Sequence, residues 1–256
     1  MTKTMKKYFA LVALVAFAGF GLISCGGGSS SESEAEQIPT DGLLGDLPML
    51  TAKYCNKIVD LRNKLFSGEL TEDEAKKVHA EFNATEEERD AQLLLSRQAI
   101  HGKEIPVEVQ EGLGLTMNGN LKIDSEKKGV TIFAVGSGEF QRDYSNSETV
   151  RLYIIPIDTD GKAIETDRGL WYAEDGATSV IDWKKGQKFV VKAFVSVGTS
   201  SARSYNTNEM KRWAKLAKFL IIDNSSDEFK KLKDQLEADK KAEEIEAAKK
   251  VMEEKK

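Results

Sequence analysis

The sequence predicts an α+β fold in which a helical hairpin (48–102), a small antiparallel β-sandwich (108–200) and C-terminal helices (205–256) follow one another. Apolar residues recur every three or four positions between Leu50 and Leu65, which is the helical period. Short apolar runs separated by Gly-rich turns fill the middle of the chain, as in small β-sandwiches. From Ser226 onward Lys, Glu and Ala dominate, which favours a solvated helix.

The hairpin prediction rests on one apolar stripe and on two possible helix starts. The stripe of the first helix consists of Leu50, Tyr54, Ile58, Leu61 and Leu65. Ser67-Gly68 ends that helix, and Thr71 to Glu74 has the spacing of a capping box, so a second helix begins there. Thr85 to Glu88 repeats the same spacing, and we expect the second helix to kink or restart at that point.

The sandwich prediction rests on a turn signal followed by several strands. Asn118-Gly119 lies between short apolar runs and predicts a hairpin turn, because both residues tolerate positive φ. The expected strands cover residues 130–135, 150–157 and 188–195, with weaker ones at 169–172 and 178–183. Pro156 disfavours a central position for its strand, because proline cannot donate a ladder hydrogen bond.

The C-terminal region contains one ambiguous segment and one charged tail. Asn206 to Glu209 can cap a helix with Met210 and Trp213 on its inner face, whereas residues 213–222 fit either that helix or a closing strand. The tail has one apolar stripe, made of Phe229, Leu232 and Leu236. Beyond that stripe no heptad register persists, so we favour a solvated helix over a coiled coil.

The N-terminus has the features of a secretory signal peptide over residues 1–24. Three lysines precede the apolar run Tyr8 to Leu22, which is shorter than the about 20 apolar residues of a typical membrane span. The run ends in Leu22-Ile23-Ser24-Cys25, which resembles the lipobox of bacterial lipoproteins. The resemblance implies that Cys25 receives a diacylglycerol thioether, that cleavage precedes it, and that the protein is lipid-anchored in the outer membrane.

Residues 25–47 are rich in Gly, Ser and Glu and predict a flexible tether, because such a composition buries little apolar surface. The acidic residues of this segment also resemble the surface-export signal of Bacteroidota lipoproteins. They stand further from Cys25 than in that family, which leaves the surface and the periplasmic face of the membrane both open.

Charge and cysteine content limit the classes of partner and of cross-link. The formal net charge is −5, and removal of residues 1–24 leaves 34 basic and 42 acidic residues, a charge of −8. An acidic protein is a poor partner for nucleic acid. Apart from Cys25 the sequence contains only Cys55, so no internal disulfide is expected, and Cys55 fits a buried thiol near the apolar stripe.

The β-region resembles the immunoglobulin-like sandwiches of many bacterial lipoproteins over about residues 110–200, on the runs DTDGKAIE and KKGQKFVVKAFVSV. Asp158-Thr159-Asp160-Gly161 begins like a calcium loop, but it lacks the later ligands, which favours an Asp-Gly turn. Trp171, Tyr172 and Trp183 fit either a sandwich core or an exposed aromatic platform, and we favour the core.

Catalytic signals are sparse, with two histidines (His79 and His101), no metal-spaced cluster and no phosphate loop. His79 fits a half-buried position on the second helix. We therefore expect no catalytic, cofactor-binding or metal-binding residues. The sequence favours a non-catalytic envelope lipoprotein that contacts protein or glycan, with a glycan-processing hydrolase built on carboxylates as the alternative.

Overall fold

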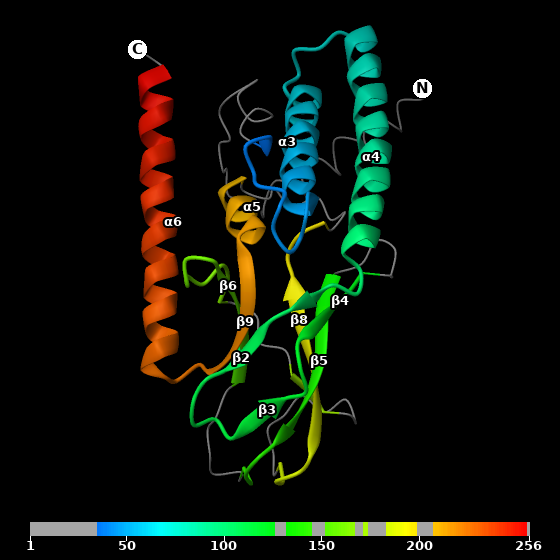
Figure 1. Cartoon of the computed structure of the whole chain (residues 1–256). Helices are drawn as coiled ribbons and strands as arrows, with labels where there is room; N and C mark the ends of the chain where they lie inside the picture. The colour runs from blue at the N-terminus through cyan, green and yellow to red at the C-terminus, as the bar shows by residue number, and fades with distance from the viewer. Residues whose placement is uncertain are drawn as a thin grey trace, which may run out of the picture.

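The computed structural model describes residues 35–125, 132–144, 152–166, 171–173, 183–198 and 207–254. Within them the chain is an α+β protein built from two β-sheets, a helical hairpin at one end of the sheets and a long C-terminal helix beside them (Figure 1). The predicted fold class is therefore confirmed, and most of the strand pairs are antiparallel.

The predicted helical hairpin consists of α3 (Leu47–Phe66) and α4 (Glu72–Ile100). Thr71 caps α4 through the predicted box: its Oγ1 accepts from the Glu74 N–H, and the Glu74 carboxylate accepts from the Thr71 N–H at 2.8 Å. The expected kink at Thr85 is wrong, because α4 runs through it and Thr85 is buried against the rest of the molecule.

A buried tyrosine joins the two helices of the hairpin. Tyr54 on α3 is 3% exposed, and its hydroxyl donates to Glu88 Oε1 on α4 at 2.8 Å. Burial and, to a smaller extent, the hydrogen bond to the Glu88 carboxylate raise the pKa of Tyr54 to about 12, because both disfavour the phenolate.

The end of the predicted tether is packed instead of flexible. Ile38, Leu44 and Leu47 are at most 2% exposed and belong to the main core. Gly42 permits this packing, since a Cβ there would lie 2.4 Å from the Ala214 carbonyl oxygen. The glycines that suggest flexibility in the sequence therefore include one that allows close contact.

The larger sheet has six strands in the order β1-β4-β5-β8-β7, with β3 also paired to β5. Its strands are, in chain order, β1 (Glu104–Ile105), β3 (Leu115–Met117), β4 (Leu121–Asp124), β5 (Ile132–Phe140), β7 (Trp171–Ala173) and β8 (Lys188–Val195). The long pair β5 and β8 forms its centre.

The predicted hairpin at Asn118-Gly119 is wrong. Both β3 and β4 pair antiparallel with β5 and lie one after the other along it, with Met117 opposite Gly138 and Lys122 opposite Val135. Residues 118–121 thus face only two residues of β5, and the segment is a bulge in an interrupted strand. The Asn-Gly signal reports the local backbone conformation, with Gly119 at φ 90°, but it does not specify the pairing partner.

The smaller sheet has the order β2-β9-β6, formed by β2 (Val107–Val109), β9 (Leu216–Asp223) and β6 (Leu152–Asp158). The closing strand β9 resolves the ambiguity of residues 213–222, because the helix α5 (Thr207–Ala214) ends just before it. The pair β2 and β9 is parallel, which departs from the expected all-antiparallel unit. Pro156 lies on β6, an edge strand of this sheet, as its missing donor requires.

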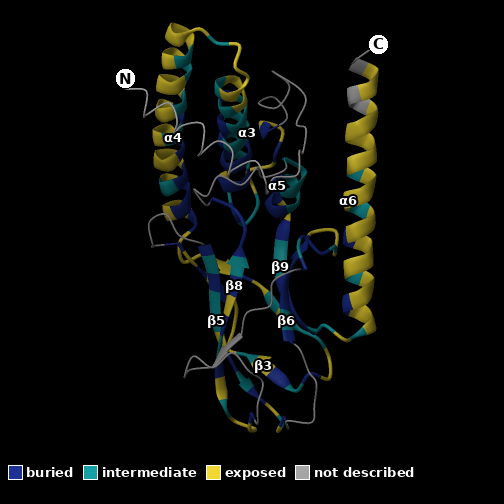
Figure 2. Ribbon diagram, turned by 180° about the vertical axis from the view of Figure 1, so that it is seen from behind, coloured by how far each residue is buried: buried dark blue, intermediate teal, exposed yellow. Residues whose placement is uncertain are grey.

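The two sheets share one core between their inner faces. The larger sheet contributes Ala134 to it, and the smaller sheet contributes Ile154 and Ile221; all three are at most 3% exposed. The hairpin adds Leu50 and Leu93 to the same cluster, so the body is continuous from the sheets into the base of the hairpin (Figure 2).

The C-terminal helix α6 (Asp227–Glu254) covers the outer face of the smaller sheet, on the side away from the larger sheet (Figure 1). Phe229 and Leu232 pack there in a second cluster with residues of β6 and β9. Higher on the helix, Asp239 pairs with Lys162 at 2.8 Å and Glu243 pairs with Arg212 at 2.5 Å. The inner side of α6 therefore changes from apolar to charged along its length.

Candidate interaction surface

The outer face of the larger sheet carries apolar and aromatic side chains that are partly exposed. Strand alternation places Phe133 and Val135 of β5, together with Val190 and Phe194 of β8, on this face. Phe133 and Phe194 are directly opposite in the register, and their rings meet edge to face with centroids 6.1 Å apart. We call these four residues the outer apolar row.

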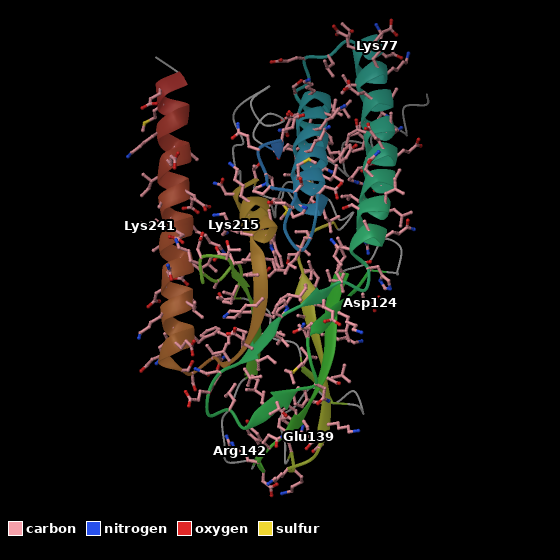
Figure 3. All side chains as sticks on the ribbon, in the orientation of Figure 1. Lys77, Asp124, Glu139, Arg142, Lys215 and Lys241 are labelled. Atoms are coloured by element: carbon pink, nitrogen blue, oxygen red, sulfur yellow. The ribbon has the colours of Figure 1, made fainter. Side chains whose placement is uncertain are left out.

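Charged residues of both signs surround the outer apolar row. They are Lys122, Asp124, Glu139, Lys188 and Lys192. Asp124 and Glu139 lie toward opposite ends of the sheet, as Figure 3 shows. An apolar centre with a charged margin is the usual composition of a protein contact surface.

Sequence reasoning missed this surface, although a signal was present. In the run KFVVKAFV of β8, every second residue from Phe189 is buried, while the alternate set contains Val190 and Phe194 as well as lysines. Apolar residues on both sides of a strand indicate that both sides have contacts, but only the pairing with β5 shows that two Phe side chains meet.

The structure describes the side chain of only one of the three predicted aromatic residues, Trp183. Trp183 is 4% exposed and packs on Phe140, with ring centroids 4.3 Å apart, so the prediction of a core residue is confirmed for it. The backbone of β7 pairs Trp171 with Val191 and Tyr172 with Val190. The structure describes only the backbone of Trp171 and Tyr172, so their predicted core position stays a prediction.

The Asp158 to Gly161 segment forms the turn favoured by the sequence. Asp158 is 6% exposed, and its Oδ1 accepts from the N–H groups of Asp160 and Lys162 at 2.9 and 2.8 Å. Asp160 pairs with Lys215 at 3.2 Å. These carboxylates organise the turn and its ion pairs, and among the described residues no three His, Cys, Asp or Glu side chains gather as a metal site would require.

The histidines occupy helix positions with local partners. His79 is exposed on α4, in contrast to the half-buried position expected, and its Nδ1 lies 3.3 Å from Asn83 Nδ2. His101 caps the end of α4, and its Nδ1 accepts from the Ser125 N–H at 3.2 Å. The Ser125 hydroxyl donates to the Arg97 carbonyl at 2.8 Å, so this Ser–His contact joins α4 to the end of β4.

A buried arginine connects the base of the hairpin to the segment after β8. Arg97 is 5% exposed, and its Nη1 donates to the Gly198 carbonyl at 3.4 Å. Burial lowers the pKa of Arg97, because desolvation disfavours the charged form. Gly198 also donates its N–H to Thr51 Oγ1 of α3 at 2.9 Å, so both helices of the hairpin are hydrogen-bonded to this segment.

The two cysteines of the sequence lie in different parts of the chain. The predicted lipidation site, Cys25, lies outside the described residues. Cys55 on α3 is only partly buried, whereas the sequence predicted a buried thiol. None of the helices in the described part of the chain is long and apolar enough to cross a membrane.

Comparison with known proteins gives no relative for this chain. Searches against family models, curated proteins and solved structures each found no match.

Proposed function

We propose that this protein is a lipid-anchored envelope lipoprotein of the outer membrane that acts as a non-catalytic binding or structural module. The anchor is supported by Leu22 to Cys25, together with the three lysines and the apolar run that precede this motif. The contact surface is the outer apolar row of the larger sheet. That row is the observation that carries the binding part of the proposal.

The outer apolar row suits a partner that brings both apolar and polar groups. Aromatic side chains contribute strongly to protein contacts and also stack against sugar rings, because their faces are flat and apolar. The charged margin supplies donors from three lysines and acceptors from two carboxylates. An envelope protein or a glycan fits this chemistry, and nucleic acid fits poorly with the acidic net charge.

The anchor is tested by Cys25→Ala in the full chain. We expect loss of lipid labelling and either release into a soluble fraction or accumulation of an uncleaved precursor. Retained lipid labelling and unchanged membrane recovery would rule out the anchor.

The contact surface is tested in cells with a photoreactive p-benzoylphenylalanine placed at Val190. Leu95 on α4, which is 60% exposed and is not part of the larger sheet, is the matched control position. We expect a discrete adduct at position 190, identified by mass spectrometry as protein or glycan, and its loss when Phe194→Ala is added. Equal labelling at positions 190 and 95 would contradict the assigned surface.

A further inference from the structure

The distal part of α6 exposes large apolar side chains on one line. Ile245 is 49% exposed and Met252 is 62% exposed, seven residues apart. Two other large apolar side chains are strongly exposed in the described structure, Phe66 at the hairpin tip and Leu95 on α4, and each stands on a separate helix. Only α6 therefore presents such residues in a series among the described elements.

This line points away from the body. Leu236 is 4% exposed on the body side of α6, and at about 100° per residue Ile245 lies roughly opposite to it around the helix. Ala238 and Ala242 continue the line toward the start of the helix, and both are exposed. Figure 1 shows α6 standing at the margin of the molecule.

The spacing matches the contact positions of a short two-stranded coiled coil. With Ala238, Ile245 and Met252 at d positions, Ala242 and Lys249 occupy a positions, and Lys241 and Glu246 flank the seam at g and e. This outward register differs from the inward stripe of Phe229, Leu232 and Leu236. Exposure around the helix, which sequence periodicity does not give, separates the two stripes.

The flanking charges select a parallel pair of identical helices. In a parallel pair, Lys241 at g meets Glu246 of the second copy at e, five positions further on, and the same contact repeats by symmetry. An antiparallel pair would instead bring the acidic flanks around Glu246 and Glu253 of the two copies together, which is unfavourable. Figure 3 labels Lys241 on α6, clear of the sheets.

We propose that the distal half of α6 is a self-association surface through which two copies of this chain pair in parallel. Ile245 and Met252 form the apolar contact, and Lys241 with Glu246 of the second copy fixes the direction. The short seam, with Lys249 at an a position, gives a weak and reversible dimer. The inference does not depend on the anchor or on the outer apolar row.

Disulfide trapping in the full chain tests this pairing. In a Cys55→Ser background, Met252→Cys is compared with Lys240→Cys, an exposed position on the same helix that lies about 120° around it from Met252. We expect Met252→Cys to form disulfide dimers at least tenfold faster under mild oxidation. Equal rates at the two positions would overturn the proposal.

Charge exchange supplies the second arm of the experiment. Lys241→Glu should slow dimer formation through Met252→Cys several-fold, and the added change Glu246→Lys should restore it. A rate unaffected by either change would overturn the parallel register. The Cys55→Ser chain without an added cysteine is the control for dimers formed through Cys25, and its rate is subtracted from the other two. Dimers in this control would contradict the proposed lipid modification of Cys25.

Discussion

The two sheets share one core, but their outer faces differ. The outer face of the smaller sheet is covered by α6 and includes Ile155 and Ile222, both 0% exposed. The outer face of the larger sheet carries the partly exposed outer apolar row between charged residues. A covered face contributes to folding, whereas a partly exposed apolar face is available for a partner.

The strand sequences reflect this difference. The strand β9 reads LAKFLIID and is apolar on both sides from Phe219, as expected when both faces are covered. The strand β8 reads KFVVKAFV and alternates more strictly, with lysines only on the outer side. Composition on the second face of a strand therefore indicates whether another element lies over it.

The largest predicted effect separates the two outer faces directly. Ile222→Ala removes a fully buried side chain and should destabilise the protein by about 2–5 kcal/mol, whereas Val190→Ala on the outer apolar row should cost less than about 1.5 kcal/mol. Urea unfolding of both variants measures the difference. Similar losses would show that the larger sheet is covered as fully as the smaller one.

A second prediction concerns the inner face of the larger sheet. A Cβ at Gly138 would lie 2.3 Å from both the Thr116 carbonyl oxygen and the ring of Phe189. Gly138→Ala should therefore cost about 1–3 kcal/mol, since backbone and a buried ring must shift. The neighbouring outward change Ser137→Ala is the control and should alter the urea midpoint little. Equal stability of the two variants would contradict the close packing.

Local signals predicted the elements of this fold better than their pairing. The box at Thr71 and Glu74 appears as predicted because it depends on residues within one turn. The same spacing at Thr85 lies inside α4, where the backbone donors already have helical partners. The Asn118-Gly119 signal gives a bulge because β5, which is distant in sequence, supplies the pairing for both flanking strands.

The candidate surface was less predictable than the fold for a similar reason. Alternation places Phe133 and Phe194 on the second face of their strands, but their contact depends on the register between β5 and β8. Likewise, the buried end of the expected tether depends on a close contact between Gly42 and Ala214, which no local pattern reports.

A third prediction tests how much of α6 is needed to cover the smaller sheet. Truncation after Ala238 keeps Phe229, Leu232 and Leu236 and removes the ion pairs of Asp239 and Glu243. Because ion pairs near the surface contribute little, the melting temperature should fall by less than about 5 °C. Truncation after Ser226 is the comparison and should lower it far more. A large fall in melting temperature after truncation at Ala238 would show that the distal part of α6 stabilises the body.

The smallest predicted effect is the pH dependence of the contact between Lys162 and Asp239, which helps to hold α6 beside the smaller sheet. The hydrogen bond and the charge of Asp239 raise the pKa of Lys162, since both favour the ammonium form. A group with a raised pKa in the folded state stabilises that state below its unfolded pKa of 10.5, and this contribution disappears as the pH rises through the folded value.

The difference in urea midpoint between the original chain and Lys162→Met should therefore be present at about pH 9 and shrink by about pH 11.5. Lys240→Met, at an exposed lysine on the same helix as Asp239, controls for general loss of lysine charge. A difference that stays constant between the two pH values would show that the ammonium of Lys162 does not help to hold α6.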